Sequence, residues 1–314
     1  MNFIQQAYKG GNQWYLYLLV IFLVLLGWQF IGVIPLAVTA ILHSENTSEF
    51  LRAADDSFMS LGIDKNLFLF MMVVMFAFGL LSLFIGVKYI HKRAIKTVIT
   101  SRDKIDWNRF WFGFLVWGLL CISVVAADIF ISSENYTWNF KPIPFFTLLV
   151  VSFLFLPIQT SFEELLFRGY FMQGLGTWFK NRWVPLIITS VAFGLLHGAN
   201  PEVEKLGYIS MVFYIGTGFF FGITTLLDEG TELALGLHAI NNIVAAFLVT
   251  TDWTVFQTDA LFIDTSEPSV GAEMFLPVFV LYPLMLLLFS KKYGWKNWKE
   301  KLFGRIEKPE VIEA

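Results

Sequence analysis

Two adjacent carboxylates and an arginine interrupt an otherwise apolar run at residues 161–170, SFEELLFRGY. Each charge costs roughly 2.5 to 3.5 kcal/mol at the centre of a bilayer on insertion scales, so charges kept in such a run indicate a role. Glu164 and Arg168 are four residues apart in the acid-first order, which favours an ion pair on one helix face. Such a pair can simply hold two helices in register. Glu163 lies on a different face and has no partner nearby in the sequence.

Two other apolar segments carry polar side chains four residues apart. Phe193 and His197 share a helix face in FGLLHGAN, and His238 and Asn242 share one in GLHAINN. Taken singly, a histidine or asparagine in a membrane helix often only bonds a backbone carbonyl or a neighbouring helix. Together with Glu163, these residues would supply a general base, two imidazoles and an amide donor. Such a set can activate water and stabilise an oxyanion.

Other protease chemistries within a membrane find little support. The sequence has no H-E-x-x-H zinc motif and no G-x-S-x-G nucleophile elbow. Asp128 has no second aspartate in an apolar segment with which to form a catalytic dyad. The single cysteine, Cys121, has no histidine nearby in the sequence, and we interpret it as a packing residue.

The elements that carry these residues must be membrane helices. Of the 314 residues, 56% are hydrophobic and 15% are charged, and the mean hydropathy is +0.64. This composition predicts an all-α polytopic membrane protein, and a net charge of −3 does not favour nucleic-acid binding. A window of about 20 apolar residues gives about eight transmembrane helices. They fall near residues 14–42, 67–90, 110–131, 144–173, 183–199, 208–227, 233–250 and 273–290.

Charge in the connecting segments predicts the topology. The loop 88–109 and the tail after residue 290 are rich in lysine and arginine, so the positive-inside rule places both in the cytoplasm. The acidic segments 44–66 and 251–272 then lie outside, both termini lie inside, and the chain is a multi-pass protein of the inner (plasma) membrane. A short inner loop with Asp228, Glu229 and Glu232 is acidic, but acidic residues weigh little in this rule.

We expect one integrated helical domain. Residues 1–142 form about three N-terminal spans, residues 143–290 the core that carries the polar motifs, and residues 291–314 a basic cytoplasmic tail. The tail is expected to begin as an amphipathic helix on the membrane surface, with its tryptophans at headgroup level. In this topology Glu163 lies in the cytoplasmic half of its span whereas His197 comes late in the fifth. The two meet if the fourth helix continues to about Met172 or if the fifth is tilted.

The three motifs EELLFR, FGLLH and HAINN occur in this order on separate predicted spans. This set resembles the CPBP family of CAAX proteases and bacteriocin-processing enzymes, also called the Abi family, over roughly residues 143–290. The resemblance implies an intramembrane endopeptidase of the type II CAAX prenyl endopeptidase kind, which acts on a peptide or membrane-protein substrate among membrane lipids. It implies no nucleic-acid partner, and the oligomeric state stays open.

The resemblance also implies roles for individual residues. Glu163 is then the catalytic carboxylate, supported by Glu164 with Arg168, and His197 helps Glu163 to orient the water. His238 and Asn242 lie opposite, where they bind the oxyanion or a metal. Members are classed as metalloproteases, whereas the structure known for a relative is read as glutamate-dependent.

The metal question therefore stays open, with glutamate-activated water slightly favoured. Glu163, His197 and His238 match the His₂Glu ligand set of a catalytic Zn²⁺ site. Two functions from other classes are the alternatives. One is a non-proteolytic membrane binding protein, such as a bacteriocin-immunity or regulatory factor. The other is a proton-coupled transporter, which the lack of an inverted repeat disfavours.

Overall fold

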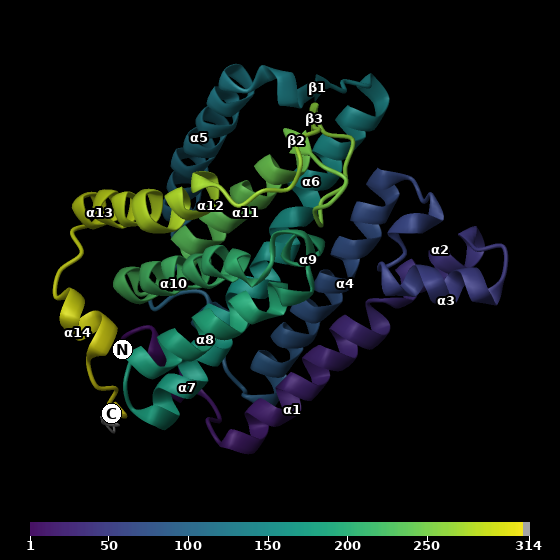
Figure 1. The fold of residues 1–314 in the computed structure, drawn as a ribbon. Coiled ribbons are helices and arrows are strands. Elements are labelled where there is room, and N and C mark those ends of the chain that lie inside the picture. The colour runs from purple at the N-terminus through teal and green to yellow at the C-terminus, as the bar shows by residue number, and fades with distance from the viewer. Residues whose placement is uncertain (310–314) are drawn as a thin grey trace.

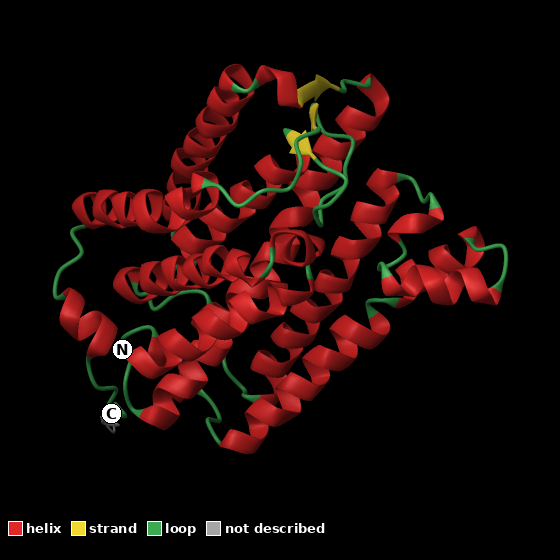
Figure 2. Cartoon of the chain, viewed as in Figure 1, coloured by secondary structure: helices red, strands yellow, loops and turns green. Residues whose placement is uncertain are grey.

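The computed structural model describes residues 1–309 and is built almost entirely of helices (Figure 2). The all-α fold class is therefore confirmed. The α-helices are α1 (Trp14–Leu25), α2 (Ile34–His43), α3 (Thr47–Asp55), α4 (Lys65–Ile85), α5 (Trp107–Ile131), α6 (Pro142–Glu164), α7 (Met172–Phe179), α8 (Trp183–Leu196), α9 (Pro201–Leu206), α10 (Met211–Asp228), α11 (Glu232–Phe247), α12 (Ala272–Leu276), α13 (Tyr282–Tyr293) and α14 (Trp298–Phe303).

Each of the eight predicted spans corresponds to an apolar helical segment, but the segments differ in length. Within the described residues, six are long and apolar enough to cross a membrane: Trp14–His43, Lys65–Ile90, Trp107–Ile131, Pro142–Phe179, Tyr208–Asp228 and Met274–Tyr293. Trp183–Ala199 and Glu232–Phe247 are shorter. At about 1.5 Å per residue, the 16 residues of α11 extend about 24 Å, less than the roughly 30 Å of a bilayer core. The protein is a multi-pass membrane protein in which two of the motif-bearing helices are short.

The short helix α11 lies at the centre of the molecule and packs along α5 and α6 (Figure 1). Small residues allow close approach between α11 and α5 and between α10 and α8, as is usual between membrane helices. A Cβ atom on Gly236 of α11 would lie 2.1 Å from the carbonyl oxygen of Phe110, and one on Gly218 of α10 would lie 2.4 Å from that of Ser190. Larger side chains at these positions would force the helices that carry the motifs apart.

A small three-stranded sheet joins two connecting segments. Strand β1 (Tyr136–Trp138) pairs antiparallel with β3 (Phe262–Asp264), and β2 (Val249–Thr250) pairs parallel with β3. In Figure 1 the sheet lies at the top, away from both termini. The sheet thus holds both ends of the segment between β2 and β3. This segment follows the C-terminal end of α11.

The acidic inner loop meets the basic segments in a network of ion pairs. Arg102 binds both Asp228, at 2.9 Å, and Glu232, at 3.1 Å. Glu229 accepts a hydrogen bond from the backbone amide of Phe3 at 2.6 Å and faces Lys301 of the tail at 3.6 Å. The network places the N-terminus, the basic loop and the tail at one end of the molecule. This arrangement agrees with the predicted topology, and their cytoplasmic orientation stays a prediction.

The tail differs from its expected surface position. Trp295 is only 8% exposed and donates from its indole Nε1 to Asp228 at 3.0 Å. The six-residue helix α14 packs against α8 and α10. The prediction of tryptophans lying on the membrane surface is therefore wrong for Trp295, because its indole packs inside the protein, where it bonds the buried carboxylate of Asp228. Residues 310–314 of the predicted tail lie outside the described residues.

Candidate active site

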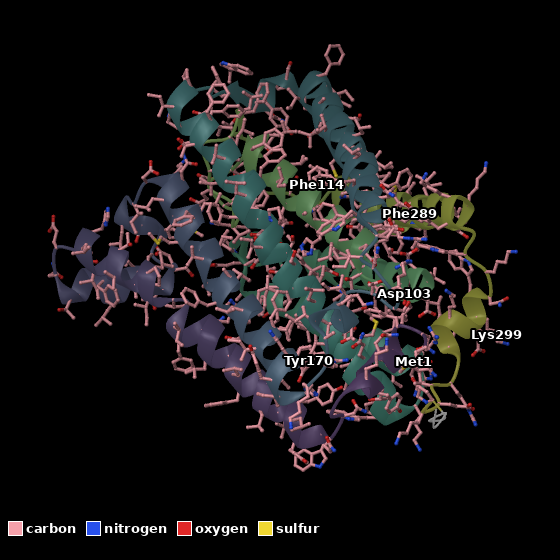
Figure 3. The ribbon with its side chains drawn as sticks, turned by 180° about the vertical axis from the view of Figure 1, so that it is seen from behind. Met1, Asp103, Phe114, Tyr170, Phe289 and Lys299 are labelled. Atoms are coloured by element: carbon pink, nitrogen blue, oxygen red, sulfur yellow. The ribbon has the colours of Figure 1, made fainter. Side chains whose placement is uncertain are left out.

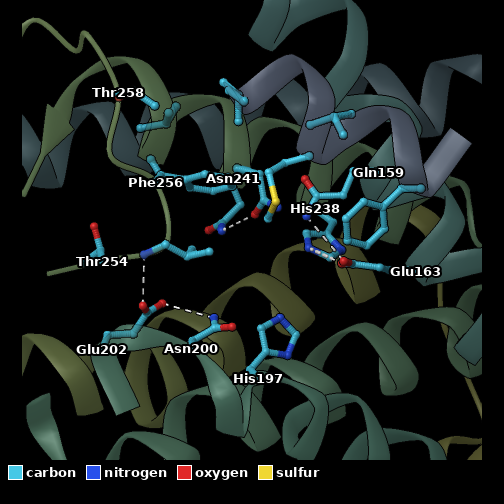
Figure 4. Close-up of a pocket in the computed structure, with 18 of the residues that line it drawn as sticks. Gln159, Glu163, His197, Asn200, Glu202, His238, Asn241, Thr254, Phe256 and Thr258 are labelled. Carbon is cyan, nitrogen blue, oxygen red and sulfur yellow. Dashed lines mark hydrogen bonds and ion pairs between the residues drawn. The ribbon is translucent and has the colours of Figure 1, made fainter. Parts of the chain in front are cut away.

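Four of the predicted site residues line one cavity of about 600 Å³ (Figure 4): Glu163, His197, His238 and Asn242. They come from α6, from the end of α8 and from α11. Apolar side chains such as Phe68, Met72 and Phe76 of α4 form much of the remaining wall. Glu164 and Arg168 do not line the cavity but are fully buried behind it. The structure therefore brings together residues that are up to 79 positions apart in the sequence.

The helix that carries Glu163 is longer than predicted. Helix α6 continues through a π-helical segment at Leu165–Phe171 into α7, so Pro142–Phe179 forms one helical run of 38 residues. The run continues for 16 residues beyond Glu163, whereas the predicted span 144–173 ended 10 residues beyond it. Glu163 and His197 line the same cavity, so the mismatch in depth expected from the sequence does not keep them apart. Local π-helix is rare and occurs often at functional sites.

Glu164 links Arg168 to His238. Its Oε1 atom accepts a hydrogen bond from Arg168 Nη1 at 3.0 Å and another from His238 Nδ1 at 2.9 Å. Arg168 also donates to the carbonyl oxygen of Gly218, and its guanidinium lies 4.1 Å from the centroid of the Phe193 ring. A carboxylate paired with arginine acts as an acceptor, so the proton on His238 lies on Nδ1 and Nε2 is turned to the cavity.

Glu163 has few partners for a buried carboxylate. Its Oε1 atom accepts a long hydrogen bond of 3.4 Å from Gln159, and its Oε2 atom lies 3.5 Å from His238 Nε2. Oε2 is buried and has no hydrogen-bond partner among the described residues. A buried polar atom that lacks a partner is costly and calls for an explanation. The arrangement leaves this oxygen free to accept a proton from a group in the cavity.

His197 is held by the motif that contains it. Its Nδ1 atom bonds the carbonyl oxygen of Phe193, one helical turn earlier, at 2.8 Å. A carbonyl can only accept, so Nδ1 carries the proton and Nε2 remains available in the neutral ring. The ring also stacks on Tyr214, with centroids 4.6 Å apart and planes 20° apart. The four-residue spacing of F-x-x-x-H thus fixes which nitrogen of His197 serves the cavity.

Asn242 is oriented by a short hydrogen-bond chain. Trp117 donates to Oδ1 of Asn241 at 3.2 Å, and Asn241 donates from Nδ2 to Oδ1 of Asn242 at 3.2 Å. Because the oxygen of Asn242 is engaged, its Nδ2 group is the part left to donate, and no acceptor for it occurs among the described residues. Such a donor suits a developing negative charge in the cavity.

Several polar residues of the cavity were missed from the sequence. Gln159 precedes Glu163 by one turn and shares its face, and Asn241 adjoins Asn242, so helical spacing could have found both. Asn200, Glu202 and Tyr214 also line the cavity. They lie beyond the end of α8 and on α9 and α10, and no spacing rule in the sequence relates them to the motifs.

The proposed metal ligands do not form a recognised cluster. No group of three or more histidine, cysteine, aspartate or glutamate side chains that could hold a metal ion occurs in residues 1–309. Glu163 and His238 face each other, but His197 contacts Phe193 and Tyr214 instead of completing the set. The residues as placed do not fit a three-ligand Zn²⁺ site. The zinc hypothesis stays a prediction.

Comparison with known proteins gives two related matches. The family described as type II CAAX prenyl endopeptidase Rce1-like matches residues 142–244, a range that contains all six predicted site residues. The uncharacterized protein YyaK of Bacillus subtilis (strain 168) is 31% identical over 261 residues, which cover 82% of this chain and 85% of YyaK. No solved structure matches the chain.

Proposed function

We propose, because the chain belongs to the Rce1-like family of type II CAAX prenyl endopeptidases, that it hydrolyses a peptide bond with water activated by Glu163. The observation that carries this proposal is the unpartnered Oε2 atom of Glu163, which is buried in the cavity that also holds His197, His238 and Asn242. A carboxylate with one oxygen that accepts no hydrogen bond from the described residues is available as a general base.

The proposed reaction has two steps. In the first, the oxygen of a water molecule attacks the scissile carbonyl carbon while a carboxylate oxygen of Glu163 takes the water's proton. The carbonyl π bond breaks and its electron pair becomes an oxyanion. In the second, the carbonyl re-forms, the carbon–nitrogen bond breaks, and Glu163 returns its proton to the leaving amine. A positioned base of this kind contributes about 10²- to 10⁴-fold to the rate.

The histidines and Asn242 take complementary roles in this proposal. His197 presents an unprotonated Nε2 that accepts a hydrogen bond from the attacking water. Asn242 donates to the oxyanion from Nδ2. His238 lies between Glu164 on Nδ1 and Glu163 near Nε2, so it donates to the oxyanion from Nε2 when both nitrogens carry protons. Glu164 and Arg168 hold that ring in place.

The substrate is proposed to be a membrane-associated peptide segment. The cavity has a largely apolar wall, and the low dielectric of such a site strengthens each contact between charges and dipoles. The family's name points to a prenylated chain end, so a prenylated peptide is the first substrate to test. We further propose that both termini face the cytoplasm, which agrees with the cluster of basic segments at one end.

The test is a cleavage assay on purified protein in detergent micelles. The probes are a fluorescence-quenched farnesylated peptide with a C-terminal CAAX sequence, its unprenylated twin, and a library of membrane-spanning peptides. We expect wild type to cleave at least one probe and Glu163→Gln to lose about 10²-fold or more of the rate, as expected for loss of a general base. Glu134→Gln serves as control, because Glu134 lies in the connection between α5 and β1 and does not line the cavity.

Two outcomes would overturn the proposal. Full activity in Glu163→Gln would remove the base from the mechanism. Absence of cleavage of every probe, together with tight binding of one of them, would favour the non-proteolytic binding protein. Elemental analysis and a chelator in the same assay test the zinc hypothesis: stoichiometric zinc that is lost in His197→Ala would establish a metal site.

A further inference from the structure

A second carboxylate of the cavity, Glu202, lies on the opposite side from Glu163 (Figure 4). Its Oε1 atom accepts hydrogen bonds from the hydroxyl of Tyr214 at 2.5 Å and from Nδ2 of Asn200 at 3.2 Å. Its Oε2 atom accepts from the backbone amide of Val255 at 3.1 Å. Unlike Glu163, Glu202 has a donor on each oxygen, so its charge is already engaged.

The first of these contacts leads to His197. The ring of Tyr214 stacks on the imidazole of His197, and its hydroxyl is anchored by Glu202 and Asn200. An aromatic ring that is fixed at its far end cannot turn away from the face it covers. With Nδ1 bonded to Phe193, the stack is the second contact that sets the direction of Nε2 of His197. Glu202 thus reaches the site through Tyr214.

The second contact leads to the segment between β2 and β3. Residues 254–258 of this segment line the cavity, and the bond to the amide of Val255 ties them to α9. The same segment is anchored by Thr258, whose hydroxyl donates to the carbonyl oxygen of Ala246 at the end of α11. Glu202 therefore joins the wall that carries His197 to the segment that covers this side of the cavity.

We propose that Glu202 is a positioning residue, which holds Tyr214 against His197 and ties segment 251–258 over the cavity; the inference rests on the proposed function. Glu202 does not touch the reacting atoms in this proposal. Its removal lets the Tyr214 ring rotate and the covering segment open, so Nε2 of His197 no longer points steadily at the water. Displacements of about 1 Å in a reacting geometry can cost about 10²-fold in rate.

Kinetics of three variants test the proposal on whichever probe wild type cleaves. Glu202→Ala removes both ties and should lower kcat by about 10²-fold, with KM changed by less than about threefold. Tyr214→Phe keeps the stacked ring but loses the anchor, so kcat should fall by a smaller factor. Glu202→Gln retains one acceptor oxygen and should recover part of the activity lost in Glu202→Ala.

Tyr136→Phe is the matched control. Tyr136 also donates its hydroxyl to a carboxylate, that of Asp128, but neither residue lines the cavity. The control should keep wild-type kcat. Hydrogen–deuterium exchange gives a second readout that does not depend on cleavage: amides of residues 251–258 should exchange faster in Glu202→Ala and at the wild-type rate in Tyr136→Phe.

The outcomes separate this proposal from the proposed function. If wild type is active and Glu202→Ala keeps its kcat, or loses only thermal stability, the positioning role is wrong. If wild type cleaves no probe, the proposed function fails on its own. The exchange data then test separately whether Glu202 holds segment 251–258 in place. Unchanged exchange at residues 251–258 in Glu202→Ala would overturn that role as well.

Discussion

Asp228 and Glu163 are both carboxylates on membrane helices, but their surroundings differ. Asp228 accepts hydrogen bonds from Arg109 and Trp295 on one oxygen and from Arg102 on the other. Its side chain is 1% exposed. Glu163 is 13% exposed, has one long bond from Gln159, and leaves Oε2 without a hydrogen-bond donor among the described residues. Figure 3 shows the crowded side chains of the molecule from the opposite side to Figure 1, with Asp103 of the basic loop labelled.

The difference in hydrogen-bond donors distinguishes a carboxylate that stabilises the fold from one that is a candidate for catalysis. A buried charge with donors on each oxygen has its lost hydration replaced, and it fixes how the surrounding segments meet. Asp228 joins the basic loop to the tail in this way. A buried carboxylate that lacks such donors gains little stability for the fold, and it is the kind of group that active sites retain. The same residue type thus indicates structure at one end of the molecule and function in the cavity.

Neutralising each carboxylate should give opposite results. Asp228→Asn removes the charge that balances Arg102 and Arg109, and we expect a loss of about 3–5 kcal/mol in the free energy of unfolding, as for a broken buried ion pair. Activity per folded molecule should persist. Glu163→Gln should lose activity but keep or raise the melting temperature, because it removes an unsatisfied charge. Thermal unfolding in detergent and specific activity measure both effects.

A large loss of stability in Glu163→Gln would contradict this contrast. It would mean that Glu163 has stabilising partners in the membrane that its surroundings in the cavity do not supply. Glu134→Gln is again the control, since this exposed carboxylate belongs to neither region.

Asn242 and Asn139 provide a second contrast. Asn242→Ala removes the proposed oxyanion donor and should lower kcat by about 10²- to 10³-fold, as the loss of one such donor does elsewhere. The loss of stability should be modest, about 1 kcal/mol, because the variant loses the one hydrogen bond that Oδ1 of Asn242 accepts from Asn241, while Nδ2 has no acceptor among the described residues. Steady-state kinetics with the probe that wild type cleaves measure the effect.

Asn139→Ala is the matched control for that experiment. Asn139 donates from Nδ2 to the carbonyl oxygen of Ala260, beside the sheet, and does not line the cavity. We expect it to keep wild-type kcat and to lose some stability. Equal rates in Asn242→Ala and Asn139→Ala would show that the amide of Asn242 plays no part in the reaction.

Loss of the Trp295 indole is a smaller change in the hydrogen bonds around Asp228 than loss of the Asp228 charge. Trp295→Phe keeps an aromatic ring in the core but removes the donor to Asp228, and a hydrogen bond to a charged group contributes about 1.5–3 kcal/mol. Thermal unfolding should show a loss of stability in this range without loss of activity. Trp298→Phe, in the same tail, removes an indole that has no such bond among the described residues and should have a smaller effect.

Hydropathy and helical spacing were sufficient for much of this molecule. The apolar runs predicted where the helices lie, because each must be apolar to enter a membrane. The four-residue spacings correctly paired Glu164 with Arg168, since a single helix determines that contact. The same spacing placed His238 and Asn242 on one cavity wall.

Contacts between distant segments were beyond the reach of such patterns. The bond between Trp295 and Asp228 spans 67 residues, and the one between Glu202 and Val255 spans 53. Each depends on how whole helices approach one another, which local periodicity does not encode. The strands β1 and β3 are three residues long and pair across the core sequence, so they gave no periodic signal of their own.

His91 provides the smallest expected effect and a third kind of buried titratable group. It follows the span Lys65–Ile90 and is fully buried. Its Nδ1 bonds the carbonyl oxygen of Gly11 at 2.6 Å, and its Nε2 bonds the hydroxyl of Tyr170 at 2.7 Å. The carbonyl only accepts, so the neutral ring with its proton on Nδ1 satisfies both partners. Burial, helped by Arg93 and opposed by the bond to Gly11, lowers the pKa of His91.

This lowered pKa predicts how stability depends on pH. The unfolded chain binds a proton at His91 near its ordinary pKa of about 6.5, whereas the folded protein does so only at lower pH. The contribution of the neutral ring is therefore complete above about pH 6.5 and is lost as the pH falls from there through the folded pKa. Melting temperatures measured in detergent across this window should fall with pH in wild type and fall less in His91→Gln. His43→Gln changes an exposed histidine and should leave the wild-type dependence in place; an equally steep curve in His91→Gln would assign the effect to other groups.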